Sequence, residues 1–194
     1  MFRAAAMNSI PRCALLILLA AVGPASTASP LLAADPLPKF NANNELIRPE
    51  GYREWIFAGA SLAMGYNEGA KPPENPKFHN IYIQPFAYRQ YKKTGKFPEG
   101  TILMMEVLSA GSHASINRQG HFEDKVSGVE AAVKDSKHIP EGWGYFSFDG
   151  GDGKIAPTAK AFPKERCWSC HNEHGASDNV FTQFYPVLRE ARSH

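Results

Sequence analysis

The chain has 194 residues and a formal net charge of +2 at pH 7, from 21 Lys and Arg against 19 Asp and Glu. This length suits one domain of ordinary size that follows a short leader. The basic and acidic residues are interspersed, without a block of Lys and Arg that could follow a phosphate backbone, so nucleic acid is not an expected partner.

The first residues have the pattern of a secretory signal peptide. Two arginines precede an uninterrupted apolar run at 14–22, and small residues follow at 26–28. The apolar run is much shorter than the roughly 20 residues that span a bilayer, which makes a retained membrane anchor the weaker interpretation. We expect a signal peptide over 1–28, with cleavage near 28–34, export to the periplasm and no membrane attachment after cleavage.

Beyond the leader, an extended segment rich in Pro, Ala and Asn (29–49) leads into a domain expected over 50–194. Runs of β-branched and aromatic residues predict strands. The expected strands are 52–62, with a short helical start, then 78–83, 101–108, 122–133 and 143–148. A helix is expected to begin at Pro85 and to end at Thr94-Gly95.

The pattern becomes helical from Pro163 onwards. Val180, Phe184 and Val187 or Leu188 recur at three- and four-residue spacing, which predicts that they lie on one helical face. The predicted fold class is therefore α+β, a mainly antiparallel β-sheet with flanking helices.

The sequence Cys167-Trp168-Ser169-Cys170-His171 has the Cys-x-x-Cys-His pattern of c-type haem attachment. Two thiols three residues apart lie on one helical turn and reach the two vinyl groups of a porphyrin, and the next residue supplies an imidazole to the iron. Loss of Cys13 with the leader would leave these two cysteines alone in the mature chain. We expect covalently attached haem c, bound through Cys167 and Cys170 on a helix near the C-terminus, with His171 as the iron ligand.

Two other interpretations of this motif stay open. A Cys-x-x-Cys dithiol can be a redox catalyst, although such motifs normally lie in a βαβ unit near the start of a chain. Zinc is the second alternative, since His174 would complete a set of four ligands with Cys167, Cys170 and His171. Adjacent residues, however, do not easily occupy two corners of one tetrahedron.

Beyond the motif, the sequence resembles the cytochrome P-460 family, which includes the c-prime-beta cytochromes. The resemblance runs from about residue 40 to 192 and depends on the shared order of short stretches. These are Gly51-Tyr52-Arg53-Glu54-Trp55, Tyr82-Ile83, Tyr91-Lys92-Lys93-Thr94-Gly95, Gly128-Val129-Glu130-Ala131, Val133-Lys134-Asp135-Ser136 and Phe184-Tyr185-Pro186-Val187-Leu188.

The resemblance implies a mainly antiparallel β fold, a homodimer, and a five-coordinate c-type haem whose distal face is open to small nitrogen ligands. It also implies a division of chemistry within the family. One branch oxidises hydroxylamine with a haem cross-linked to a lysine, and the other lacks the cross-link and binds nitric oxide.

Three residues are candidates for the distal pocket. Met105 stands where the resemblance places the cross-linking lysine, and methionine is a common apolar filler beside a flat cofactor. His79 stands where the hydroxylamine oxidisers have an arginine; it is expected to donate to a bound ligand, to relay protons or to ligate iron, or else to be a partly exposed strand residue. Glu130 is expected to accept protons in the pocket, or else to pair with Lys134 or Arg118.

The leading hypothesis is an exported mono-haem cytochrome that binds nitric oxide or a related small nitrogen ligand, without assured catalysis. A hydroxylamine-oxidising enzyme is the first alternative. The presence of Met105 at the place of the cross-linking lysine is evidence against it. A periplasmic electron carrier is the second; it would need His79 or Met105 as a sixth iron ligand. A periplasmic redox partner is an additional expectation.

Overall fold

The computed structural model describes residues 36–66, 69, 71, 73–151 and 153–191. The predicted signal peptide (1–28) and the first part of the predicted extended segment (29–35) lie outside the described residues. Within those ranges, no helix is both long and apolar enough to cross a bilayer.

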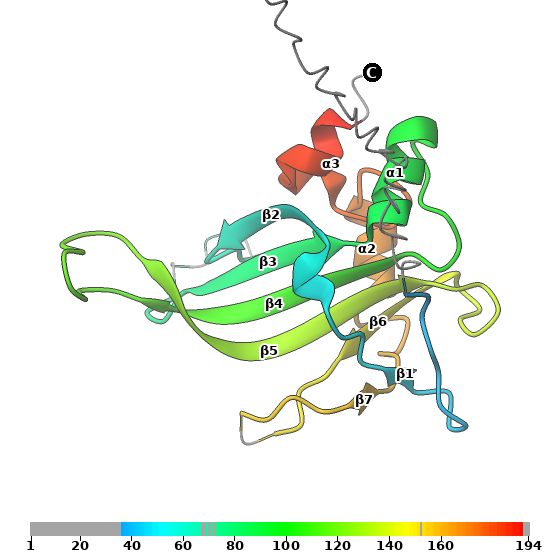
Figure 1. The fold of residues 1–194 in the computed structure, drawn as a ribbon, viewed down its shortest axis with the longest axis horizontal. Helices are drawn as coiled ribbons and strands as arrows, with labels where there is room; N and C mark the ends of the chain where they lie inside the picture. Colours follow the sequence, from blue (N-terminus) through cyan, green and yellow to red (C-terminus); the bar gives the residue numbers. More distant parts are fainter. Residues whose placement is uncertain (1–35, 67–68, 70, 72, 152, 192–194) are drawn as a thin grey trace, which may run out of the picture. The chain divides into compact units, whose positions relative to one another are not determined.

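Five antiparallel strands form the main sheet and lie side by side in their sequence order (Figure 1). Their bounds are β2 Ile56–Leu62, β3 Lys77–Ile83, β4 Ile102–Gly111, β5 Phe122–Lys134 and β6 Trp143–Ser147. A small second sheet pairs β1 (Leu46–Ile47) with β7 (Thr158–Ala159). The predicted α+β fold with a mainly antiparallel sheet is confirmed.

The first helix has the predicted start and stop. Helix α1 (Pro85–Thr94) begins with proline, whose fixed φ suits a first turn and whose missing N–H has no partner there in any case. It ends at Gly95, whose φ of 71° is the left-handed conformation that glycine adopts without strain. The 3-10 turn η1 (Tyr52–Glu54) is likewise the short helical start predicted before β2.

The segment predicted to be helical from Pro163 onwards forms three short helical pieces, and Phe184 does not share a buried face with Val180 and Leu188. The three pieces are α2 (Trp168–His174), the 3-10 turn η2 (Thr182–Phe184) and α3 (Pro186–Glu190). Asp178 and Asn179 have φ values of 49° and 59°, which no α-helix contains. Pro186 then starts a new helix, and Phe184 is exposed while Val180 and Leu188 are buried.

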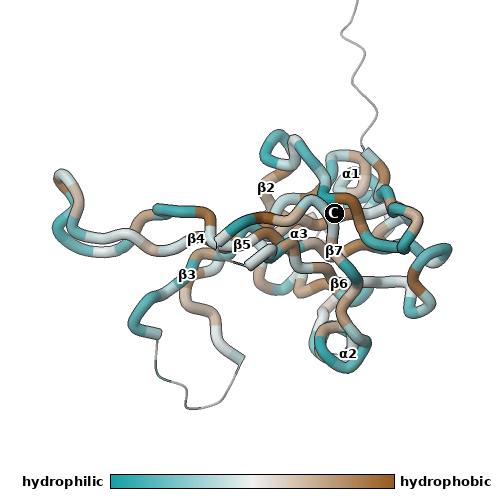
Figure 2. Tube along the Cα trace, turned by 90° about the horizontal axis from the view of Figure 1, so that it is seen from below, coloured by the Kyte–Doolittle hydropathy of each residue, from teal (hydrophilic) through white to brown (hydrophobic). Residues whose placement is uncertain are grey.

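The two faces of the sheet support two separate apolar clusters, as the alternation of side chains along a strand requires. Ile81, Leu103 and Tyr145 lie in one cluster, together with α1 and the C-terminal segment. Met104 and Phe146 lie in the other, beneath the segment that carries η1 and β1. Helix α2 contributes no fully buried residue, and its outer turn is largely hydrophilic (Figure 2).

The second cluster contains a buried carboxylate. Glu106 on β4 is 3% exposed and accepts a hydrogen bond of 2.6 Å from the Tyr52 hydroxyl. It also pairs with the Arg53 guanidinium, and the Tyr82 hydroxyl donates to it at 3.4 Å. Burial, followed by the bond to Glu106, raises the pKa of Tyr52.

Candidate haem site

A cavity of about 450 Å³ lies between the sheet and the C-terminal segment. This volume falls within the range of about 300 to 1,000 Å³ that is usual for small-molecule and cofactor sites. The side chains around it are Tyr66, Lys77, His79, Ile81, Leu103, Met104, Met105, Val107, Glu130, Ala131, Ala132, Tyr145, Cys167, His171, Asn179, Val180, Phe181 and Tyr185.

The sheet side of the cavity contains all three candidate distal residues. His79 on β3 pairs with Val107 on β4, and two residues further along β3 Ile81 pairs with Met105. Met105 pairs in turn with Glu130 on β5. The strand register therefore brings together three side chains that the sequence separates widely, and each of the three lines the cavity.

The opposite side carries the Cys-x-x-Cys-His motif. Cys167 is the N-cap residue of α2, and Cys170 and His171 lie within the helix. Both thiols are free; that of Cys167 is half-buried at the cavity and that of Cys170 is exposed. Burial raises the pKa of the Cys167 thiol, so it is held in its neutral form.

His171 has the tautomer that a metal ligand needs. Its Nδ1 lies 2.9 Å from the carbonyl oxygen of Asn179. A carbonyl only accepts, so Nδ1 carries the proton and donates it to this bond, which leaves the lone pair of Nε2 free to bind a metal. Burial lowers the pKa of His171, which also favours the neutral imidazole.

Two aromatic rings pack against this imidazole and restrict its orientation. The ring of Tyr145 on β6 lies 4.1 Å from it between centroids, and the ring of Phe181 lies 4.4 Å away. Helix α2 ends at Gly175, where an added Cβ would lie 2.5 Å from the His171 carbonyl oxygen and 2.9 Å from the Val180 nitrogen. Only glycine permits the chain to pass this close to the backbone of His171 and Val180.

The cavity places two titratable groups in apolar surroundings. Burial, and secondarily the charge of Lys77, lower the pKa of His79. Burial raises the pKa of Glu130, an effect that Arg166 partly opposes. Among the described residues, Glu130 forms no ion pair with Lys134 or Arg118, and Lys134 pairs with Asp178 at 2.7 Å instead.

The raised pKa of Glu130 predicts a measurable pH dependence of stability. An acid whose pKa is higher in the folded state contributes stability below its unfolded pKa of about 4.3, and this contribution is lost as the pH rises through the folded pKa. We therefore expect Glu130→Gln to gain stability relative to the wild type as pH rises, in urea unfolding from about pH 4 to 8. Glu123→Gln, an exposed carboxylate on the same strand, is the matched control; parallel curves for the wild type and Glu130→Gln would contradict the assignment.

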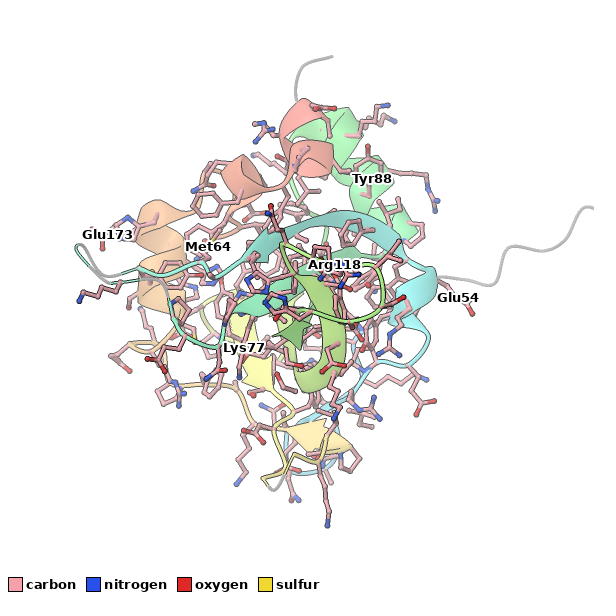
Figure 3. The ribbon with its side chains drawn as sticks, turned by 90° about the vertical axis from the view of Figure 1, so that its left-hand side faces the viewer. Glu54, Met64, Lys77, Tyr88, Arg118 and Glu173 are labelled. Carbon is pink, nitrogen blue, oxygen red and sulfur yellow. The ribbon has the colours of Figure 1, made fainter. Side chains whose placement is uncertain are left out.

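Sequence reasoning missed several residues of this cavity. Lys77 lies two residues before His79 on β3, at the strand end that faces the viewer in Figure 3. Residues two apart on a strand lie on the same face, so the candidate position of His79 could have indicated that Lys77 also faces the cavity. Tyr145, Asn179 and Tyr185 carried no such signal, because their positions depend on the packing of β6 and on turns late in the chain.

The residues present fit a haem. The cavity has apolar side chains on its sheet side, free thiols one helical turn apart, and an imidazole with Nε2 free. In addition, the buried side-chain Nδ2 of Asn179, which lines the cavity, has no acceptor among the described residues. In the part of the chain that the structure describes, no group of three or more His, Cys, Asp or Glu could hold a metal ion, so the four ligands considered for zinc are not brought together.

An antiparallel sheet, an apolar cavity on one of its faces and a Cys-x-x-Cys-His helix beside that cavity are the features of a haem protein. The chain matches the family model described as Cytochrome P460 over residues 49–182. It therefore belongs to the cytochrome P460 family, which implies a haem cofactor. No curated protein matches the chain.

Proposed function

We propose that this protein is an exported mono-haem c-type cytochrome that binds nitric oxide or a related small nitrogen ligand. One observation carries the proposal: a single cavity joins His171, with its free Nε2, to His79, Met105 and Glu130 on the sheet. Cys167 and Cys170 would hold the haem covalently and His171 would ligate its iron. The bound haem would supply an iron with one open coordination position.

The chain's own residues prepare the site for a small neutral ligand. Ile81 and Val107 contribute apolar surface on the sheet side. Burial lowers the pKa of His79, so at neutral pH this side chain is an uncharged imidazole that can donate one hydrogen bond. Met105 fills the position between Ile81 and Glu130 with an apolar group.

Hydroxylamine oxidation is the second candidate. The resemblance places the cross-linking lysine of that chemistry at Met105, which argues against it. One observation favours it, since Lys77 brings a primary amine to the same cavity. The two functions differ in whether haem is bonded to a residue outside the Cys-x-x-Cys-His motif.

The proposal also includes the cellular setting. The pattern over 1–28 supports cleavage of a signal peptide and a periplasmic protein. The resemblance supports a homodimer and a periplasmic redox partner.

An optical titration tests the ligand. Purified haem protein is reduced without oxygen, and its spectrum is recorded before and after addition of nitric oxide. We expect the spectrum of a high-spin c-type haem that shifts on addition. An unchanged spectrum would contradict the proposal, and a ferrous Soret band at the wavelength for which the family is named would favour hydroxylamine oxidation.

Replacement of His79 tests the distal hydrogen bond. We expect His79→Leu to dissociate nitric oxide about fivefold faster than the wild type in stopped flow, since one hydrogen bond contributes on the order of 1 kcal/mol. His121→Leu removes an exposed histidine from the β4–β5 hairpin, outside the cavity lining, and is the control. Equal dissociation rates for the wild type and His79→Leu would show that His79 makes no bond to the ligand.

A further inference from the structure

Two donors share the carbonyl oxygen of Asn179. His171 Nδ1 donates to it at 2.9 Å, and the buried Tyr145 hydroxyl donates to it at 3.0 Å. Tyr145 also places its ring against the imidazole. The hydroxyl and the imidazole therefore belong to one hydrogen-bonded unit that reaches from β6 to α2.

The shared carbonyl lies in a tight, hydrogen-bonded turn. Residues Ser177 and Val180 exchange backbone hydrogen bonds of 2.9 and 3.3 Å across the turn. The two residues between them, Asp178 and Asn179, are both left-handed, a conformation that Asp and Asn tolerate better than most side chains.

The side chain of Asp178 fixes this turn to the sheet. Its Oδ2 accepts a hydrogen bond of 2.7 Å from Lys134 Nζ, and its Oδ1 accepts one of 3.2 Å from Trp143 Nε1. Lys134 also donates to the carbonyl of Phe97 at 2.9 Å. Because the turn is tied to β5 and β6, we expect the Asn179 carbonyl to keep its position when one donor is removed.

A carbonyl that already accepts one hydrogen bond is a poorer acceptor for a second, because the first donor draws electron density from the oxygen. We infer that Tyr145 tunes the electron donation of His171, and hence the reduction potential of the haem, by sharing the Asn179 carbonyl with Nδ1. Tyr145 is a positioning residue in this scheme, since it acts on the iron through His171. The inference rests on the haem attachment proposed above and not on the identity of the ligand.

The sign of the effect follows from this sharing. Without the Tyr145 hydroxyl, the Asn179 carbonyl accepts a stronger hydrogen bond from His171 Nδ1. The imidazole therefore gains anionic character. A more electron-rich imidazole stabilises ferric over ferrous iron, so the reduction potential falls and the iron–histidine bond strengthens.

Two substitutions at one position test the inference in opposite directions. We expect Tyr145→Phe, which keeps the ring, to lower the reduced-to-oxidised ratio about threefold at a fixed potential, a shift of about 28 mV for a one-electron couple. The iron–histidine stretching frequency of its ferrous form should rise in resonance Raman spectra. Replacement of Tyr145 by 3-fluorotyrosine, whose hydroxyl is a stronger donor, should move both quantities the other way and covers the case in which Tyr145→Phe fails to fold.

Tyr91→Phe is the matched control, because it also removes a buried tyrosine hydroxyl, but one away from the cavity. It should leave the potential and the stretching frequency unchanged. Identical potentials and frequencies in the wild type and the position-145 variants, or shifts of the same sign in both of them, would overturn the inference. Both measurements are made without nitric oxide, so their outcome is independent of the titration that tests the proposed ligand.

Discussion

Replacing Cys167 and Cys170 together with alanine is expected to abolish covalent haem attachment. The two thiols are the only described cysteines, and they lie one helical turn apart beside the cavity. His171 would then hold haem through a single coordinate bond that denaturation breaks. Intact mass spectrometry of the denatured chain should show the haem adduct in the wild type and none in the double variant.

Single variants and a cysteine outside the motif complete this experiment. Cys167→Ala and Cys170→Ala should each keep the haem through one thioether, with lower yield. Cys13→Ala should match the wild type, since Cys13 belongs to the predicted leader. A haem adduct that persists in the double variant would contradict attachment at this motif.

Replacing Glu106 with leucine is expected to cost about 3 kcal/mol of stability. The carboxylate is buried and accepts hydrogen bonds from the Tyr52 and Tyr82 hydroxyls. Its loss leaves the buried Tyr52 hydroxyl without this acceptor and removes the partner of Arg53. For a domain of this size the change corresponds to a fall of about 6 to 12 °C in Tm. Thermal unfolding followed by circular dichroism measures it.

The same variant also separates stability from function. Glu106 lies on the face of the sheet opposite the cavity, with Met105 and Val107 on the cavity face. Its replacement should therefore leave the haem spectrum and the response to nitric oxide unchanged. Tyr82→Phe, which removes the donor of the 3.4 Å bond but keeps the carboxylate, should cost about 1 kcal/mol or less. A Tm for Glu106→Leu within 2 °C of the wild type would show that the carboxylate network contributes little.

The strands and α1 could be predicted because their signals are local. Alternating β-branched and aromatic residues mark β3 to β6, and Pro85 and Gly95 mark the two ends of α1. The break between the C-terminal helical pieces was not predicted, because apolar spacing alone does not show that Asp178 and Asn179 take left-handed conformations. Those conformations depend on the Lys134 and Trp143 side chains that hold Asp178, and these lie far away in the sequence.

The residues of the candidate site likewise fall into two groups, those with a local signal in the sequence and those placed by tertiary packing. The Cys-x-x-Cys-His motif was visible because attachment and ligation need adjacent residues. His79, Met105 and Glu130 line one cavity, and their roles there stay predictions. The contact of Tyr145 with His171 depends on how β6 packs against α2, and no sequence pattern predicts it.

Covalent haem attachment and the proposed function are tested most directly by locating the bonds between haem and protein. The purified haem protein is digested with a protease, and tandem mass spectrometry identifies each peptide that carries haem. We expect haem on one peptide alone, the one that contains Cys167 and Cys170. Haem released on denaturation would contradict covalent attachment, and a second bonded peptide that contains Lys77 or Met105 would contradict the proposed ligand-binding function in favour of hydroxylamine oxidation.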